Sequence, residues 1–596
     1  MFATNADKNE KNYRKGRIAF AIFASLFGGF TVGMCSLFFA SGPYTYNVWL
    51  SYLTNPYILL LNIIPPIILS AVFYLLFNRT LWSFIATNAL VIIPSLVNYY
   101  KIAFRGDCFI AADFSLISES SKMLESYKLF IDRRIGIYLA VLAIGCVMLA
   151  LFAKGRFRKG SWYRYVAAVI ILALSAALIP IYTSDEVYNK KTSNTAVEST
   201  WTESRLFMSK GFVYPFLYSI KDTFDTPPEG YSAGEAKEIL ASYKDEAIPD
   251  DKKVNIVCVM LEAYNDFSRF DELTFTEDVY AKYRELESIG YSGTLVTDIF
   301  AGDTRISERQ FLTGMPFDRM DDFVSSSNSY VWYLRENGYT VEGSHPCYAW
   351  FYNRQNINKN LGFENYYFTE NYYKALSNSD VTWDGKLFPL MRDIYLNRDK
   401  SKPYFSFSIT YQGHGPYDSD VAHFESPYVE SSHVSEADKN ILNNYIDAQK
   451  GTTEYLYAFV QEMLATEEPL VLVFFGDHKP WMGNAGTVYG SYGINIDTSG
   501  EAGFMNYYST RYLILANDAA KKVTGNSFIG EGDTISVSFL MNKVFELCGY
   551  KGNAYMQFTS DIMKEEPIIH RTQISKNETT ALYDRVSYYY RKNFVY

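Results

Sequence analysis

Four polar motifs in the second half of the chain each follow an apolar run. Glu262 follows residues 254–261, Gly302-Asp303-Thr304 follows 293–300, His414 follows 403–410, and Asp477-His478 follows 469–475. Such runs are typical of strands that are buried in a parallel sheet. Because ligands gather at the carboxyl ends of parallel strands, we expect these four motifs to converge.

The converging side chains offer two carboxylates, a hydroxyl and an imidazole. Oxygen donors with one nitrogen suit Mn²⁺, Mg²⁺ or Zn²⁺, so Glu262, Thr304, Asp477 and His478 are the candidate metal ligands. Metal coordination lowers the pKa of a hydroxyl, which makes Thr304 the candidate nucleophile. A helix is predicted to begin at Arg305, and its N-terminus would favour an arriving phosphate.

Each of these residues also has a structural interpretation. Thr304 is placed to act as a helix N-cap, and Ser307 with Gln310 has the spacing of a capping box. Glu262 is explained equally well as a surface residue after a strand, and Asp477-His478 as a turn. The joint occurrence of all four at predicted strand ends favours the functional interpretation.

The elements that must position these residues alternate between strands and helices. Helical patterns at Val279–Ile289 and Ala437–Leu464 lie between the apolar runs. This alternation predicts an α/β domain with a mostly parallel central sheet, which we place at residues 251–570 with a tail at 571–596.

The first 185 residues have a different composition. Five apolar stretches, at about 18–40, 56–77, 80–99, 136–154 and 164–183, approach the length that crosses a bilayer. They predict a five-helix transmembrane domain over residues 1–185. A cleavable signal peptide is the alternative for the first stretch, but four further spans follow it. Residues 186–250 are predicted to be a juxtamembrane linker with a short helix at Val213–Ile220, and 114–117 and 123–130 to be interfacial helices or exposed loops.

Basic residues predict the orientation of these spans. Five lysines and arginines precede the first span, and the loop 154–160 between the fourth and fifth spans is also basic. Because such segments stay in the cytoplasm, five crossings place everything after residue 185 outside the cell.

Composition excludes several other classes of protein. The net charge of -10, without a lysine or arginine stripe, argues against nucleic acid as a partner. The six cysteines show no CxxC spacing, so neither a structural zinc site nor a disulfide framework is indicated.

The motifs together resemble a known family. Residues 259–263 (Val-Met-Leu-Glu-Ala), Gly302-Asp-Thr304 with 308–314 (Glu-Arg-Gln-Phe-Leu-Thr-Gly), and 475–478 (Phe-Gly-Asp-His) are similar to the lipoteichoic acid synthase and phosphoglycerol transferase family. That family is a membrane-bound branch of the alkaline phosphatase/sulfatase superfamily, and the likeness covers nearly the whole chain. It implies a sulfatase-like fold and one divalent metal, usually Mn²⁺, on Glu262, Thr304, Asp477 and His478.

The resemblance also implies a reaction. Thr304 would attack the phosphorus of phosphatidylglycerol, release diacylglycerol and form a glycerophospho-threonine intermediate, which a hydroxyl of a glycolipid or glycan acceptor resolves. His345, Tyr352, Arg354 and His414 match substrate-binding positions, with His414 placed to bind or protonate the phosphate. The planar fork of Arg354 suits bidentate phosphate contact. An ordinary surface loop is the alternative for His345 and Arg354.

Three departures from the family pattern concern the substrate. Tyr352 replaces a usual tryptophan, Cys347 stands near an expected acid, and Met482 stands near an expected small polar residue. We therefore expect a multi-pass protein of a bacterial cell membrane that transfers glycerol phosphate to a lipoteichoic acid-type polymer or another envelope glycan.

Three alternatives remain open at this point. They are a metal-dependent phosphodiesterase, a phosphoethanolamine-type transferase, and a non-catalytic scaffold that keeps the fold. A formylglycine sulfatase is excluded, because Thr304-Arg-Ile-Ser lacks the Cys/Ser-x-Pro-x-Arg setting.

Overall fold

The structure of the protein is a computed structural model. It describes residues 2–42, 46–105, 108–111, 113, 131–194, 203–223, 226–316, 325–349, 351–483, 486–572 and 577–595. The chain divides into two compact units, Met1–Thr226 and Pro227–Tyr596, which are described separately. Residues 114–117 and 123–130, for which interfacial helices or loops are expected, lie outside the described residues.

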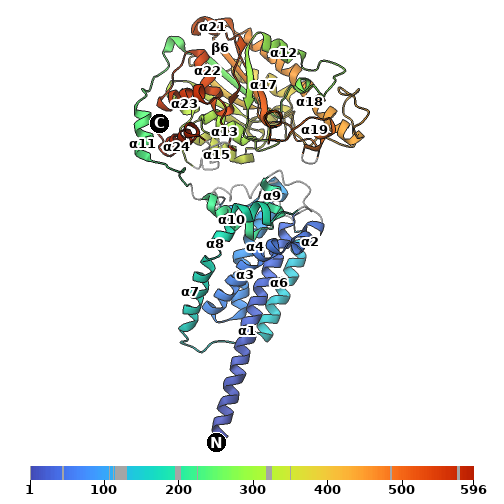
Figure 1. Ribbon diagram of the computed structural model, residues 1–596, viewed down its shortest axis with the longest axis vertical. Helices are drawn as coiled ribbons and strands as arrows, with labels where there is room; N and C mark the ends of the chain where they lie inside the picture. The colour runs from blue at the N-terminus through green and yellow to red at the C-terminus, as the bar shows by residue number, and fades with distance from the viewer. Residues whose placement is uncertain are drawn as a thin grey trace. The chain divides into compact units, whose positions relative to one another are not determined.

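The N-terminal unit is built on long apolar helices. Within the described residues, four are long and apolar enough to cross a membrane: they lie in α1 (Phe2–Ala40), α3 (Pro56–Phe77), α4 (Thr80–Arg105) and α6 (Arg133–Phe152) (Figure 1). Buried hydroxyls join them, because Ser36 Oγ lies 2.8 Å from Ser95 Oγ and Ser70 Oγ donates to Ser25 O at 2.7 Å. These bonds satisfy polar groups that lipid could not satisfy.

The fifth predicted span is divided into two helices. α7 (Tyr163–Ala176) is shorter than a bilayer requires, and α8 (Ile179–Tyr182) follows it. Pro180 lies in the first turn of α8. A proline ring clashes with the carbonyl group four residues earlier, here that of Ala176, which is the last residue of α7.

Part of the predicted linker packs onto the apolar helices. The unit also contains α2 (Tyr46–Thr54), the π-helix η2 (Val187–Lys191), α9 (Glu203–Ser209) and α10 (Val213–Thr223), and α10 covers the short helix expected at 213–220. Asn62 of α3 donates to Lys210 O at 2.8 Å and accepts from Phe212 N at 3.2 Å. These bonds fix the turn between α9 and α10 to the membrane helices.

The C-terminal unit is organised around a nine-stranded mixed sheet. Its order is β4-β3-β5-β1-β6-β7-β2-β8, with β9 also pairing with β2. The strands are β1 (Asn255–Leu261), β2 (Tyr291–Val296), β3 (Thr340–Ser344), β4 (Asn365–Tyr367), β5 (Tyr404–Ile409), β6 (Leu470–Gly476), β7 (Ser509–Ala516), β8 (Gly530–Glu531) and β9 (Ile535–Ser536).

Strand directions bring the predicted motifs to one edge of the sheet. β4, β3, β5, β1 and β6 are mutually parallel. β7 runs antiparallel to both β6 and β2, so β2 points the same way as β6. The carboxyl ends of β1, β2, β3, β5 and β6 therefore share one edge.

Two hydrophobic layers cover the two faces of the sheet. Along β1, Ile256, Cys258 and Met260 pack into one core, whereas Val257, Val259 and Leu261 pack into the other. This alternation follows from the two-residue period of a strand. The continuous apolar run of β1 is thus explained by burial on both faces.

Helices complete the layers. One core includes residues of α14 (Tyr330–Glu336), α22 (Leu540–Cys548), α23 (Ala554–Glu565) and α24 (Glu578–Lys592); the other includes α12 (Ala281–Ser288), α17 (Asp384–Leu396) and α18 (Glu436–Leu464). The remaining helices are α11 (Ala233–Ala241), α13 (Arg305–Thr313), α15 (Arg354–Asn360), α16 (Lys374–Ser377), α19 (Thr487–Ser491), α20 (Glu501–Tyr508) and α21 (Asp518–Thr524). Tyr590 of α24 stacks on Tyr555 of α23 at 3.9 Å, so the tail helix packs on the domain.

Candidate metal and phosphate site

The carboxyl edge of the sheet brings three of the predicted ligands together. One ligand atom each from Glu262, Asp477 and His478 lies within 4.8 Å of the others, and all three side chains are buried. Thr304 Oγ1 lies 3.4 Å from Glu262 Oε2 and 3.5 Å from His478 Nε2. We call these four residues the metal cluster.

Backbone contacts between the strand ends hold the metal cluster in place. Glu262 N donates to Thr410 Oγ1 at 2.9 Å, and Ala263 N donates to Asp477 Oδ1 at 2.8 Å. The loop after β5 passes so close that a Cβ at Gly413 would lie 2.0 Å from Glu262 O. Only glycine therefore fits at this position.

Thr304 is presented by a strained loop rather than used as a helix cap. It stands at the N-cap position of α13, but its side chain makes no capping bond. The three preceding residues, Ala301, Gly302 and Asp303, have φ values of 58°, 122° and 55°. Left-handed backbone is costly for residues other than glycine, and such strain concentrates at functional sites.

The metal cluster has the donor set that a divalent cation requires. His478 Nδ1 donates to Lys479 O at 2.9 Å, so Nε2 carries the lone pair, which accepts from Gly302 N at 3.1 Å. Nε2 lies 3.2 Å from Asp477 Oδ2, a buried atom with no hydrogen-bond partner in the described part of the chain. Burial and the adjacent Asp477 carboxylate raise the pKa of Glu262 to about 8. Acceptors crowded in this way are stabilised by a cation.

A second group of predicted residues forms a basic pocket next to the metal cluster. Arg354 and His345 are 2% and 4% exposed, and Arg354 Nη1 lies 3.3 Å from His345 Nε2. Because a guanidinium only donates, His345 Nε2 is the acceptor. Burial and the positive charge of Arg354 hold the pKa of His345 well below its ordinary value. The charge of Arg354 offsets part of the rise in the pKa of Glu262, so the two groups interact electrostatically.

Tyr352 lies against this basic pocket. Its ring centroid is 5.2 Å from the guanidinium carbon of Arg354 and 5.6 Å from that of Arg305, within the range of cation–π contacts. Tyr352 and Asn353 both have left-handed backbone, with φ values of 56° and 54°. The segment before Arg354 is thus strained like the segment before Thr304.

His414 is not bonded to the metal cluster, although it lies close enough to Asp477 and His345 to interact with them electrostatically. It is exposed on the loop after β5, its ring stacks on Tyr411 at 4.7 Å, and its Nδ1 donates to Gly415 O at 2.5 Å. In the described structure it makes no hydrogen bond to Glu262, Thr304, Asp477 or His478. Cys347 and Met482, which mark departures from the family pattern, are both buried, and Met482 packs in the core rather than facing a ligand.

The structure adds positioning residues that motif reasoning missed. Asn265 donates to His478 O at 2.8 Å and accepts from Lys479 Nζ at 2.9 Å, so it ties β1 to the loop after β6. Glu308 accepts from Arg354 Nε at 2.8 Å. Glu308 lies within a quoted motif, but its partner is 46 residues away, so local patterns carry no signal for the pair.

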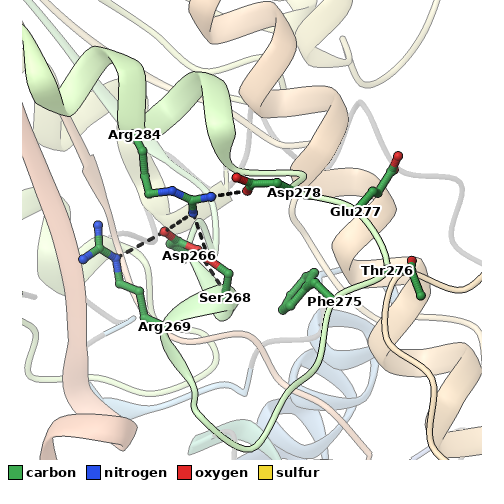
Figure 2. Close-up of a pocket in the computed structure, with 8 residues that line it drawn as sticks. All are labelled: Asp266, Ser268, Arg269, Phe275, Thr276, Glu277, Asp278 and Arg284. Atoms are coloured by element: carbon green, nitrogen blue, oxygen red, sulfur yellow. Dashed lines mark hydrogen bonds and ion pairs between the residues drawn. The ribbon is translucent and has the colours of Figure 1, made fainter.

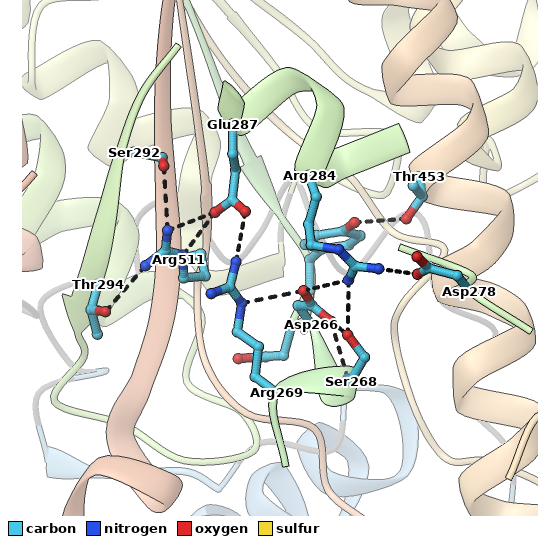
Figure 3. Close-up of polar contacts among 12 residues, drawn as sticks. Asp266, Ser268, Arg269, Asp278, Arg284, Glu287, Ser292, Thr294, Thr453 and Arg511 are labelled. Atoms are coloured by element: carbon cyan, nitrogen blue, oxygen red, sulfur yellow. Dashed lines mark hydrogen bonds and ion pairs between the residues drawn. The ribbon is translucent and has the colours of Figure 1, made fainter. Parts of the chain in front are cut away.

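A cavity of about 530 Å³ opens beside Asp266, four residues after Glu262 (Figure 2). Its charged side chains neutralise one another: Asp266 contacts Arg269 and Arg284, and Arg284 also contacts Asp278. We call the set Asp266, Arg269, Asp278, Arg284, Glu287 and Arg511 the arginine network (Figure 3). This network satisfies its own charges, so it requires no ion.

Comparisons with known proteins agree with this architecture. Residues 254–530 match the sequence model of the Sulfatase family. A curated protein of Rhizobium meliloti, named putative cyclic beta-1,2-glucan modification protein, is 24% identical over 518 residues, which are 83% of this chain and 78% of that protein.

Two solved structures are among those that are similar to this chain. Streptococcus pyogenes phosphoglycerol transferase GacH, in complex with sn-glycerol-1-phosphate, is 19% identical; the match covers 61% of this chain and 94% of that one, with a TM-score of 0.48. The lipooligosaccharide phosphoethanolamine transferase EptA of Neisseria meningitidis is 12% identical over 89% of this chain and 95% of that one, with a TM-score of 0.42.

The predicted fold is confirmed. Apolar helices precede a domain with a mostly parallel mixed sheet, and the sequence of that domain matches a single family over most of its length. Residues 254–530 of the C-terminal unit match the Sulfatase family model, and in the chain they follow helices that are long and apolar enough to span a membrane.

Proposed function

We propose that this protein is a membrane-anchored phosphoglycerol transferase that moves glycerol phosphate from phosphatidylglycerol to a cell-envelope glycan. One observation supports the proposal most strongly. The Thr304 hydroxyl makes no helix-capping bond, and it shares a site with three buried candidate metal ligands and the buried Arg354. Apolar helices on the same chain suit a lipid donor. Basic flanks of these helices support a catalytic domain outside the cytoplasm.

Glu262, Thr304, Asp477 and His478 would hold one divalent metal, for which we propose Mn²⁺. When bound, it would lower the pKa of the Thr304 hydroxyl and offset the two carboxylate charges. Magnesium and zinc fit the same donors, and metal-dependent activity with each would rank them.

The residues of the chain then divide the reaction between them. Thr304 enters the reaction as the alkoxide, its proton already released to solvent, and its Oγ1 forms a bond to phosphorus while the bond from phosphorus to the diacylglycerol oxygen breaks. Arg354 and His345 would hold the non-bridging oxygens, Tyr352 would pack against the headgroup, and His414 would supply a proton to the departing oxygen. An acceptor hydroxyl then attacks the glycerophospho-threonine, transfers its proton to His414, and regenerates Thr304.

The acceptor is proposed to be a glycan. The name of the Rhizobium relative refers to modification of a cyclic β-1,2-glucan, and that relative is similar to this chain over 83% of the chain's length. A lipoteichoic acid-type polymer is the other acceptor that the sequence motifs favour. Supplying each acceptor to the same enzyme and measuring transfer against release to water separates a transferase from a phosphodiesterase.

The nucleophile is tested with headgroup-labelled phosphatidylglycerol and the full-length protein. We expect diacylglycerol release and a glycerophosphate adduct on Thr304 by mass spectrometry. Thr304→Ala should lower release at least about 10³-fold, because no other group replaces the covalent step. Thr276→Ala, which removes a hydroxyl bonded to Pro427 O, is the matched control and should retain activity.

Full release by a folded Thr304→Ala protein would contradict the covalent mechanism. Faster release from phosphatidylethanolamine than from phosphatidylglycerol, with the adduct still on Thr304, would instead assign the chain to phosphoethanolamine transfer.

A further inference from the structure

In the basic pocket, the positive charge of the buried Arg354 is balanced by the carboxylate of Glu308. Arg354 Nε donates to Glu308 Oε2 at 2.8 Å, and the two side chains are 2% and 3% exposed. The other carboxylate oxygen, Glu308 Oε1, is buried with no hydrogen-bond partner among the described residues. The pair is therefore shielded from water, and its electrostatic effect on a nearby ligand is weakly screened.

Glu308 engages only one of the three nitrogens of Arg354. Nη1 faces His345 Nε2 at 3.3 Å, and Nη2 has no hydrogen-bond partner in the described structure. Arg354 thus keeps donors for a phosphate while its positive charge is offset by Glu308. His345 adds no charge, since its Nε2 accepts from the guanidinium. The basic pocket offers hydrogen bonds without a net positive charge.

Glu308 also shares a helical turn with the nucleophile. Its N–H donates to Thr304 O at 3.1 Å in the first turn of α13. The compensating carboxylate and the attacking hydroxyl are therefore held at a fixed spacing. A loop residue would not keep this spacing as strictly.

A pocket without net positive charge discriminates between classes of phosphate ester. A phosphodiester carries one negative charge, whereas a phosphomonoester near neutral pH carries nearly two. We infer that Glu308 is a specificity-determining residue, which makes this site favour phosphodiesters over phosphomonoesters. The inference rests on the proposed function, in which the lipid donor and the glycerophospho-threonine are both diesters. Released glycerol phosphate, a monoester, would then bind weakly.

Binding to the full-length protein tests this role without requiring turnover. Isothermal calorimetry with Mn²⁺ present compares sn-glycerol 1-phosphate, a monoester, with glycerophosphoglycerol, the diester headgroup. Glu308→Gln keeps an acceptor for Arg354 Nε but removes the charge. We expect the ratio of monoester to diester affinity to rise about tenfold or more, because one buried charge acts across a few ångströms.

Glu287→Gln is the matched control. Glu287 also accepts from an arginine, Arg511, at 2.7 Å and is 10% exposed, but it lies on α12, which contributes no residue to the site. It should leave the affinity ratio unchanged within about twofold. A second variant has the opposite sign: Arg354→Gln leaves Glu308 uncompensated, so the ratio should fall below that of the wild type. If Glu308→Gln does not fold, the affinity ratio measured with Arg354→Gln tests the inference.

An unchanged ratio in folded Glu308→Gln protein, an equal shift in Glu287→Gln, or a rise in Arg354→Gln would each overturn the inference. These results are distinct from failure of the proposed function. A protein that shows the Glu308→Gln shift but forms no adduct on Thr304 contradicts the covalent transferase alone.

Discussion

Two clusters of buried carboxylates begin four residues apart and are built on opposite principles. In the arginine network, Asp266 accepts from Arg269, Arg284 and Ser268, and Glu287 accepts from Arg269 and Arg511 (Figure 3). In the metal cluster, Glu262 and Asp477 lie beside each other and an imidazole, and Asp477 Oδ2 has no hydrogen-bond partner among the described residues.

The difference separates groups that stabilise the fold from groups that serve a ligand. A buried carboxylate with two arginines repays its desolvation within the protein, and its loss leaves Arg269 with Glu287 alone and Arg284 with Asp278 alone. Burial and then the Asp477 carboxylate raise the pKa of Glu262, so the ionised form of Glu262 is disfavoured where no cation lies beside the two acids. Removing a charge from each cluster should therefore change stability in opposite directions.

The largest effect on stability is expected in the arginine network. Asp266→Asn should lower the free energy of unfolding by about 2–4 kcal/mol, because the fully buried carboxylate compensates two guanidiniums. Chemical denaturation of the full-length protein measures the change. Asp271→Asn, an exposed aspartate in the next turn of chain, should change stability by less than about 0.5 kcal/mol. Equal changes in the free energy of unfolding for the two variants would contradict a stabilising role for Asp266.

A smaller, pH-dependent effect is expected at Asp384. This carboxylate is fully buried and accepts from Thr452 Oγ1 at 2.7 Å, and burial raises its pKa from 3.8 to about 6. The folded state thus binds this proton more tightly than the unfolded state. The resulting stabilisation is complete below about pH 4 and is lost as the pH rises through 6.

Asp384→Asn should therefore be more stable than the wild type by about 2–3 kcal/mol at pH 8, relative to the difference at pH 4. Unfolding curves at both pH values measure this. A difference between the two proteins that does not vary with pH would show that Asp384 titrates normally.

The smallest effect is expected in the metal cluster, and it has the opposite sign to that of Asp266→Asn. In chelator-treated protein at pH 9, Asp477→Asn should raise stability by about 1 kcal/mol, since it relieves repulsion with Glu262. With Mn²⁺ added, the wild type should gain stability and the variant should not. Thermal unfolding with and without metal measures both. Destabilisation of the metal-free variant would place Asp477 with the structural carboxylates.

Sequence patterns predicted most of the fold because the relevant signals are local. The apolar runs at 254–261 and 469–475 correspond to β1 and β6, and the amphipathic stretch at 437–464 corresponds to α18. The prediction of the fifth membrane span as one continuous helix was wrong, because hydropathy does not detect the steric effect of Pro180. The antiparallel β7 was not predicted, yet it sets the direction of β2 and so the position of Thr304.

The candidate site was predicted only in part. Glu262, Asp477 and His478 meet as expected because each follows a strand of the same sheet, and Thr304 joins them from the loop after β2. His414 remained a proposal, since the described structure places it on an exposed loop without a bond to the metal cluster. The pairing of Glu308 with Arg354 was missed, because long-range ion pairs leave no trace in local spacing.

The sequence by itself determined the residue types at the strand ends, the apolar helices and the resemblance to the Sulfatase family model. Those features depend on short-range periodicity and on motifs of a few residues. Only the tertiary structure decided which carboxylates are compensated and which are not. Asp266 and Glu262 look alike along the chain. Asp266 pairs with Arg269 and Arg284, which lie 3 and 18 residues further on, whereas folding brings Asp477 and His478 beside Glu262 from a distant segment.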